Sequence, residues 1–164
     1  MTTQTATKHS AAVGWFTMNL RSIVAGVALY LGALAVLATG VVHIQQYYAA
    51  DYSTIPTIGT LFFLNFVSAV VIAAGLVAPL GRVAGRYADA VRGVFAVGGI
   101  GLGVLSLVAL FISESSGLFG FVEFGYRTPI KLAIVAEVAA IVFLVIYLAA
   151  NGTGIRTIRA ASRG

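Results

Sequence analysis

Cysteine is absent from this chain, and charged residues make up only 9% of its 164 residues. Without a thiol, the chain can form no disulfide, thiolate metal site, iron–sulfur cluster or cysteine nucleophile. A soluble domain usually carries about 25% charged residues, whereas 60% of this chain is hydrophobic and its mean hydropathy is +1.01. The composition therefore indicates a membrane protein.

The positive charge of the chain does not indicate nucleic-acid binding. The formal net charge is +5, but the ten Lys and Arg residues are spread over short polar segments between apolar blocks. Basic residues in this distribution are typical of signals that orient membrane helices. We expect the partners to be the lipid bilayer and either a membrane protein or a second copy of this chain, and we expect no nucleic acid.

The apolar residues fall into blocks of the length that crosses a bilayer, about 20 residues for a hydrocarbon core of roughly 30 Å. We therefore predict an all-α integral membrane protein with one transmembrane domain over residues 19–151. A flexible polar tail is expected at 1–18 and a basic tail at 152–164. The four predicted spans cover about residues 22–42, 58–80, 93–112 and 129–150.

The basic residues predict how the helices are oriented. Only Arg127 and Lys131 fall on one side of the predicted bundle. The other eight fall on the opposite side: Lys8, Arg21, Arg82, Arg86, Arg92, Arg156, Arg159 and Arg163. Short loops rich in Lys and Arg stay in the cytoplasm. We therefore expect an antiparallel bundle in a bacterial inner membrane, with both termini cytoplasmic.

The third predicted helix contains the glycine-rich run GGIGLG at residues 98–103. Gly99 and Gly103 have the small-xxx-small spacing that lets two helix backbones approach closely. A nucleotide-binding loop is the competing interpretation, but such loops follow a strand, and this run lies inside an apolar span. The sequence favours a helix-packing role.

Glu137 is a carboxylate inside a predicted span, where acidic residues are costly and usually face the bundle interior or a water-filled cavity. At a rise of 1.5 Å per residue, it lies about 12 Å below the outer end of its helix. Each other predicted helix has a polar residue roughly 5 to 12 Å below the outer surface. These residues are Thr39, Asn65 and Ser106. All four side chains are expected to converge on one polar layer.

Two interpretations of this layer remain open. It can be a hydrogen-bonded packing device, or a proton or cation site that opens outward. Lys131 is six positions from Glu137 and so lies on a different face of the helix, which argues against a direct ion pair. Glu123 and Arg127, four residues apart, are expected to form a surface ion pair.

His43 lies at the outer end of the first predicted span, among aromatic and amide residues. It can belong to an interfacial belt or can contact a metal, a haem or another ligand. Asp51, Glu114 and Glu123 supply oxygen ligands only if the outer loops fold together, and no two candidate ligands have a strong helical spacing. We predict no metal site and no bound cofactor.

A resemblance extends from His43 to Asn65. This stretch has a histidine at the outer end of the first predicted helix, then Tyr47, then the run IPTIGTLFFLN at residues 55–65. It resembles small four-helix membrane proteins of actinobacteria, over about residues 20–80. The resemblance implies the four-span topology and a bacterial inner membrane, and it carries over no activity and no catalytic residue.

The sequence contains no Ser/His/Asp set, phosphate-binding loop, paired carboxylates or HExxH motif. We therefore expect no enzyme and no catalytic residue. The leading hypothesis is an accessory or assembly subunit that binds a larger membrane partner. The alternative is a small transporter or ion-coupled carrier that uses the polar layer around Glu137. A haem- or quinone-associated redox subunit is a third hypothesis, supported only by His43 and the aromatic residues.

Overall fold

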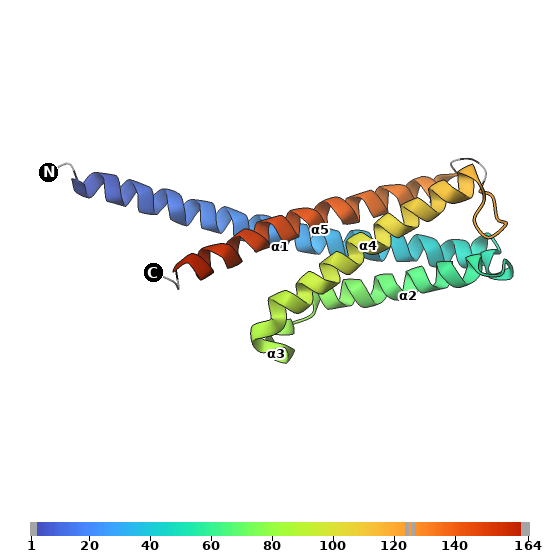
Figure 1. The fold of residues 1–164 in the computed structure, drawn as a ribbon, viewed down its shortest axis with the longest axis horizontal. Coiled ribbons are helices and arrows are strands. Elements are labelled where there is room, and N and C mark those ends of the chain that lie inside the picture. Colours follow the sequence, from blue (N-terminus) through green and yellow to red (C-terminus); the bar gives the residue numbers. More distant parts are fainter. Residues whose placement is uncertain (1–2, 124, 126, 162–164) are drawn as a thin grey trace.

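Long helices make up most of the chain in the computed structural model (Figure 1). It describes the backbone of residues 3–123, 125 and 127–161, and the side chains of residues 19–123, 125 and 127–152. Within these ranges no β-strand occurs. The long helices are α1 (Thr3–Ala49), α2 (Ile58–Val77), α4 (Ala88–Ser115) and α5 (Thr128–Ala161). Short elements between them are the 3-10 helix η1 (Tyr52–Thr54), α3 (Leu80–Val83) and the 3-10 helix η2 (Gly85–Tyr87).

Four helical stretches in the described part are long and apolar enough to cross a membrane. They cover Asn19–Ala49, Ile58–Val77, Gly85–Ser115 and Thr128–Gly152. Because most of their large apolar side chains point outward, the bundle presents an apolar surface along its length. The prediction of an all-helical chain with four potential spans is confirmed.

The second span ends earlier than predicted, at Val77 instead of residue 80. Pro79 explains the difference, because a proline pushes the residue before it out of the helical region, and Ala78 has a ψ of 147°. Arg92 of α4 then covers the exposed end of α2. Its Nε donates to the Leu76 carbonyl and its Nη2 to the Ala78 carbonyl, both at 3.2 Å.

The first and last long helices extend beyond the predicted spans, since α1 begins at Thr3 and α5 ends at Ala161. The side chains before residue 19 and after residue 152 lie outside the described part. These include the predicted orientation signals Lys8, Arg156, Arg159 and Arg163. The flexible and polar character assigned to the two tails therefore stays a prediction.

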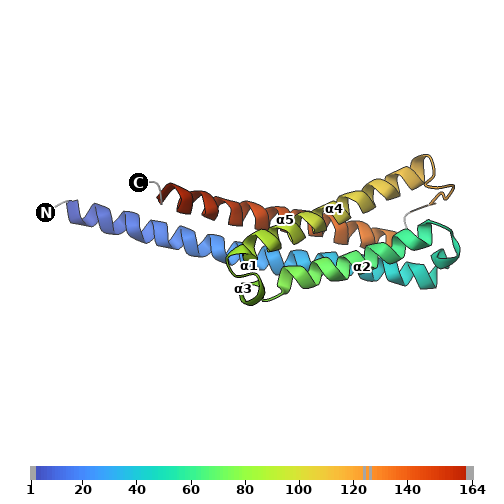
Figure 2. The same cartoon turned by 60° about the horizontal axis from the view of Figure 1, so that its bottom comes forward.

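The four long helices lie side by side over most of the length of the bundle (Figures 1 and 2). α1 packs mainly against α5 and α2, and α4 packs mainly against α5 and α2. In Figure 1 the ribbon of α1 runs towards the end where η1 lies and α2 returns from it. The ribbon of α4 runs to that end again, and α5 leaves it.

Small residues at the helix contacts explain the close packing, as is typical of helices that associate in membranes. The buried core contains alanines from all four long helices, among them Ala28, Ala69, Ala96 and Ala140. Leu144 of α5 is fully buried between two glycines. A Cβ added to Gly32 or Gly99 would lie 2.6 Å from a Leu144 methyl carbon. Each glycine therefore leaves the space that Leu144 occupies.

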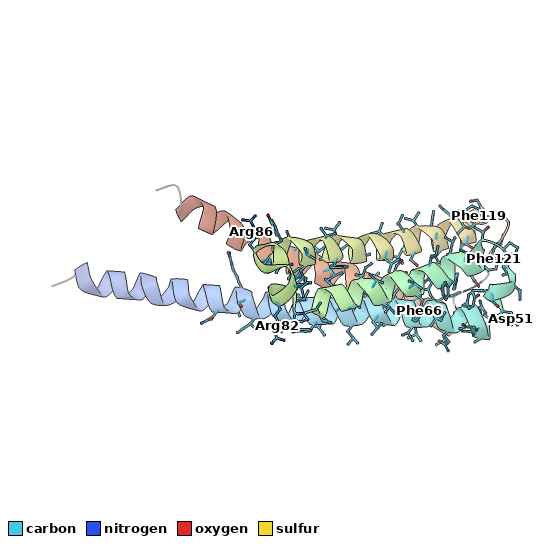
Figure 3. All side chains as sticks on the ribbon, turned by 90° about the horizontal axis from the view of Figure 1, so that it is seen from below. Asp51, Phe66, Arg82, Arg86, Phe119 and Phe121 are labelled. Carbon is cyan, nitrogen blue, oxygen red and sulfur yellow. The ribbon has the colours of Figure 1, made fainter. Side chains whose placement is uncertain are left out.

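The two ends of the bundle differ in chemistry (Figure 3). Arg82 and Arg86 lie at the end formed by α3 and η2, whereas Asp51, Phe119 and Phe121 lie at the opposite end. This second end carries η1 and the loop after α4 and is called the loop end below. The polar residues predicted inside the spans lie towards the loop end.

Candidate functional site

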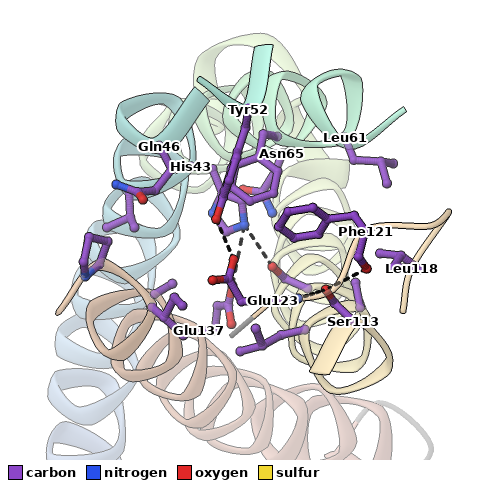
Figure 4. Close-up of a pocket in the computed structure, with 18 residues that line it drawn as sticks. His43, Gln46, Tyr52, Leu61, Asn65, Ser113, Leu118, Phe121, Glu123 and Glu137 are labelled. Atoms are coloured by element: carbon purple, nitrogen blue, oxygen red, sulfur yellow. Dashed lines mark hydrogen bonds and ion pairs between the residues drawn. The ribbon is translucent and has the colours of Figure 1, made fainter. Parts of the chain in front are cut away.

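A cavity of about 160 Å³ lies between α1, α2, α4 and α5 near the loop end (Figure 4). Its wall is mostly apolar, and polar side chains from all four helices reach into it. The larger apolar side chains of the wall are Val42, Leu61, Phe62, Leu110, Phe121 and Ile130. A few polar groups in an otherwise apolar pocket are the usual composition of a small-molecule site.

His43 of α1 is held in one orientation by its own helix. Its Nδ1 lies 2.9 Å from the backbone carbonyl of Thr39, one turn earlier. A carbonyl oxygen only accepts hydrogen bonds, so Nδ1 carries the proton. Nε2 is then the nitrogen that faces the cavity, 3.2 Å from the Ser106 hydroxyl of α4.

The surroundings of His43 do not match an interfacial belt. Its side chain is only 12% exposed, and its ring centroid lies 4.9 Å from that of Phe62. A neutral imidazole with a proton on Nδ1 accepts at Nε2, so Ser106 donates its hydroxyl proton to that nitrogen. His43 therefore presents a hydrogen-bond acceptor to the cavity.

Glu137 of α5 faces His43 across the cavity. The carboxylate is almost fully buried, and its Oε1 lies 4.0 Å from His43 Nε2. The close approach of α4 to α5 at this level depends on glycine, because a Cβ on Gly103 would lie 3.2 Å from the Glu137 carbonyl oxygen. The glycine predicted to serve helix packing thus lies against the backbone of the buried acid.

Asn65 of α2 has a buried acceptor that nothing satisfies. Its residue is 9% exposed. Its Oδ1 is the one buried side-chain nitrogen or oxygen in the described part that has no hydrogen-bond partner. Such an atom costs about 1–3 kcal/mol, and in a folded protein it calls for an explanation. Because Asn65 lines the cavity, a donor-bearing occupant would satisfy it.

The cavity therefore brings together four of the five residues predicted from sequence: His43, Asn65, Ser106 and Glu137. Thr39 is buried but does not line the cavity. Its hydroxyl turns back to donate to the Ala35 carbonyl at 3.2 Å, and its own carbonyl accepts from His43. Thr39 supports the site from behind.

A second polar cluster, here called the outer clasp, forms the wall of the cavity nearest the loops. It consists of Tyr52, Glu123 and Arg127. The Tyr52 hydroxyl donates to Glu123 Oε2 at 2.5 Å. Arg127 Nη2 donates to the Tyr52 hydroxyl at 2.7 Å and to Glu123 Oε1 at 3.0 Å. The clasp thus ties the loop after α4 to η1.

The clasp alters the titration of its members. Burial, followed by the hydrogen bond and negative charge of Glu123, raises the pKa of Tyr52 to about 12 from its ordinary value of 10.0. The hydrogen bond to Glu123 is also the main reason that the pKa of Arg127 is raised. At neutral pH the clasp therefore holds a neutral phenol between a carboxylate and a guanidinium.

Further contacts fix the loop that carries Glu123. The backbone N–H of Glu123 donates to the Ser113 hydroxyl at 3.1 Å, and that hydroxyl donates to the Phe121 carbonyl at 3.4 Å. The rings of Phe62 and Phe121 both meet the Tyr52 ring edge-on, with centroids 4.8 and 5.4 Å away. These contacts close the loop over the cavity.

Sequence reasoning missed Tyr52 and Ser113 as parts of the site. It anticipated the Glu123–Arg127 ion pair but placed it on the surface, whereas Glu123 is 9% exposed and lines the cavity. Tyr52 and Glu123 are 71 residues apart, and no local pattern connects them. Lys131 is exposed. Among the described residues no three His, Asp or Glu side chains are grouped to hold a metal ion.

Comparisons with known proteins leave the family open. No protein-family model matches this chain, and no curated protein or solved structure matches it either. The resemblance to small actinobacterial membrane proteins therefore stays a prediction. The functional argument depends on the geometry of the cavity alone.

Proposed function

We propose that this chain is a multi-pass membrane protein that binds a small polar molecule in its cavity and acts as an ion-coupled carrier. The unsatisfied Oδ1 of Asn65, next to the buried Glu137 and His43, is the observation that carries the proposal. Ionisable residues within spans commonly mark substrate, ion and proton pathways. We infer no catalytic role, because the cavity holds no activated nucleophile.

The proposed topology is an antiparallel bundle in a bacterial cytoplasmic membrane with both termini in the cytoplasm. Eight of the ten basic residues support it by their distribution. Arg82 and Arg86 lie at the end opposite Phe119 and Phe121, as expected for a cytoplasmic end (Figure 3). The loop end, with the cavity beneath it, would then face outward.

The cavity contains the parts that coupling to a proton requires. His43 Nε2 and Glu137 Oε1 lie 4.0 Å apart, with the Ser106 hydroxyl 3.2 Å from the same nitrogen. A proton can therefore move between the imidazole and the carboxylate with only a small displacement of either. A substrate that binds beside this pair would change which group holds the proton, and that change is the basis of coupling.

The test of this proposal begins with a ligand screen. The purified protein is heated with small anionic, neutral and cationic compounds, and the unfolding temperature is recorded for each. We expect at least one compound to stabilise the wild type and the exposed-site control Asp51→Asn, but not Glu137→Gln or Asn65→Leu. Flux of that compound is then measured in proteoliposomes that enclose a pH-sensitive dye.

Two results would refute the carrier proposal. One is that Glu137→Gln leaves both binding and flux unchanged. The other is a screen in which no compound depends on the cavity residues for its stabilising effect. Asp51→Asn removes a carboxylate at the same end of the bundle, and Asn tolerates the left-handed φ of 56° found there. It therefore separates an effect of the cavity from a general effect of charge.

The accessory-subunit hypothesis keeps one specific observation in its favour. The α4 span is the least covered, with 17% of its apolar window buried against 28–33% in the other three. Val94, Leu105 and Phe111 project from its outer face, each at least 69% exposed. A larger membrane partner, or a second copy of the chain, would pack on this face.

Isolation in mild detergent followed by mass spectrometry tests the accessory role. A stoichiometric partner lost in Leu105→Lys, but not in the Val24→Lys control on α1, would support it. Isolation without any partner or second copy would count against it. The carrier proposal does not depend on this result.

A further inference from the structure

The groups that face the inner part of the cavity are almost all hydrogen-bond acceptors. Asn65 Oδ1 is an acceptor without a partner, and Glu137 is a carboxyl group 4.0 Å from His43. His43 Nε2 is an acceptor because the ring proton is on Nδ1. Ser106 is the nearby donor, and its proton is directed to His43. An occupant of this region must therefore supply several donors.

The charge balance of the cavity indicates a positive occupant. In the outer clasp the carboxylate of Glu123 is paired with Arg127 at 3.0 Å, and Tyr52 is neutral at ordinary pH. The His43–Glu137 pair has no further counter-charge nearby, so it is neutral only when it holds one proton between its two members. A cation that binds beside Glu137 preserves neutrality if that proton leaves.

The size and walls of the cavity limit the cation to a small one with an apolar part. The volume is about 160 Å³, close to the roughly 150 Å³ of a protein cavity that accommodates benzene. Phe62 and Phe121 line it, and aromatic rings attract cations that lie against their faces. Leu110 and Ile130 supply aliphatic surface for a short hydrocarbon chain.

We infer that the cavity binds a small primary ammonium ion, with its N–H groups on Asn65 and Glu137 and its hydrocarbon part against Phe62 and Phe121. This inference names the substrate class of the proposed carrier and depends on that function. Binding exchanges one cation for one proton: the ammonium ion enters, the proton of the His43–Glu137 pair passes to the buffer, and the charge of the cavity is unchanged.

Isothermal titration of the purified full chain with four probes tests the inference. The probes are n-butylammonium, which has charge and donors, tetramethylammonium, which has charge without donors, 1-butanol, which is neutral, and butyrate, which is anionic. Each titration is run in phosphate and in Tris, whose different ionisation enthalpies reveal the protons released. Folding of each variant is checked by circular dichroism and gel filtration.

We expect n-butylammonium to bind at least tenfold more tightly than the other three probes and to release about one proton, by the electroneutrality argument above. Glu137→Gln should weaken its binding at least tenfold and abolish the proton release. Asn65→Leu should also weaken binding but retain the proton release, because Glu137 is still present. Asp51→Asn should leave both unchanged.

The results that contradict the inference differ from those that contradict the carrier proposal. Binding of 1-butanol or butyrate at least as tight as that of n-butylammonium, and sensitive to Asn65→Leu, would overturn the ammonium assignment and leave the carrier standing. Tetramethylammonium binding equally well would show that donors are not needed, and would also overturn it. If none of the four probes binds, the inference fails, and the broader ligand screen decides the carrier separately.

Discussion

Asn65 and Asn151 are buried in contrasting surroundings. Asn151 Nδ2 donates to the Tyr147 hydroxyl at 3.1 Å, whereas Asn65 Oδ1 has no partner. A residue that lowers stability in the empty protein is expected where a ligand supplies the missing contact, because functional sites retain such groups at a cost elsewhere. The two asparagines therefore allow a matched comparison.

Asn65→Leu is expected to raise the free energy of unfolding of the ligand-free protein by about 1 kcal/mol, because it removes an unsatisfied buried acceptor. Asn151→Leu should lower it by about 1 kcal/mol, because the buried Tyr147 hydroxyl loses its partner. Unfolding of both variants in a denaturing detergent measures the difference. A loss of stability in both would mean that Asn65 is an ordinary structural residue.

Tyr52 should titrate far later than an ordinary tyrosine. Burial and Glu123 both oppose the phenolate, so its pKa is about 12 in the folded chain against 10.0 ordinarily. Since the folded-state pKa is the higher one, the stability contributed by Tyr52 is fully present below pH 10 and is lost as the pH rises towards 12. The outer clasp is therefore stable throughout the neutral range.

The phenolate absorbance of the wild type minus that of Tyr52→Phe isolates this residue from the other tyrosines, seven being present in all. We expect the difference signal to appear near pH 12. In Glu123→Gln it should appear at lower pH, because the negative charge is gone. A midpoint at the ordinary value in the wild type would show that the clasp does not form in solution.

The contact between α1 and α2 depends on one glycine near the cavity. A Cβ on Gly40 would lie 2.6 Å from the Ala69 Cβ and 3.4 Å from the Phe66 Cα. Neither neighbour is the flexible end of a side chain, so the helices themselves would have to separate. Gly26, on the same helix, has nothing within 4 Å of an added Cβ.

Gly40→Ala is accordingly expected to lower the free energy of unfolding by about 1–3 kcal/mol, the usual cost of overpacking. Gly26→Ala should leave it unchanged or raise it by about 0.5–1 kcal/mol, because alanine favours a helix over glycine. Denaturing-detergent unfolding of both variants measures the contrast. Equal effects of the two substitutions would contradict the packing described for α1 and α2.

The absence of cysteine makes the proposed topology directly testable for the whole molecule. A single introduced cysteine is the only thiol in the protein. Ser53 and Ser116 are exposed at the loop end, and Ala90 is exposed near the arginine-rich end. We expect a membrane-impermeant maleimide to label Ser53→Cys and Ser116→Cys in intact cells, and to label Ala90→Cys only after the membrane is permeabilised.

Labelling of Ala90→Cys in intact cells without labelling of Ser53→Cys would invert the proposed orientation. Labelling of all three would mean that the chain does not separate two compartments. The cavity would then open towards the cytoplasm in the first case. In the second case, the carrier proposal would be abandoned.

Much of the fold followed from the sequence because crossing a bilayer requires long apolar helices, and these are visible as local patterns. The same is true of Gly99 and Gly103, whose spacing indicated a close helix contact. Counting 1.5 Å per residue also placed Asn65, Ser106 and Glu137 at similar depth, and these three do line one cavity.

Depth along a helix does not specify which way a side chain points around it. Thr39 lies at the expected depth, yet its hydroxyl turns back to its own helix. Tyr52 and Glu123 meet across 71 residues of sequence, and the space that leaves Asn65 Oδ1 unpaired arises from how four helices pack together. Local periodicity therefore determines the helices, whereas contacts between distant segments, which no short-range pattern encodes, decide the cavity and its chemistry.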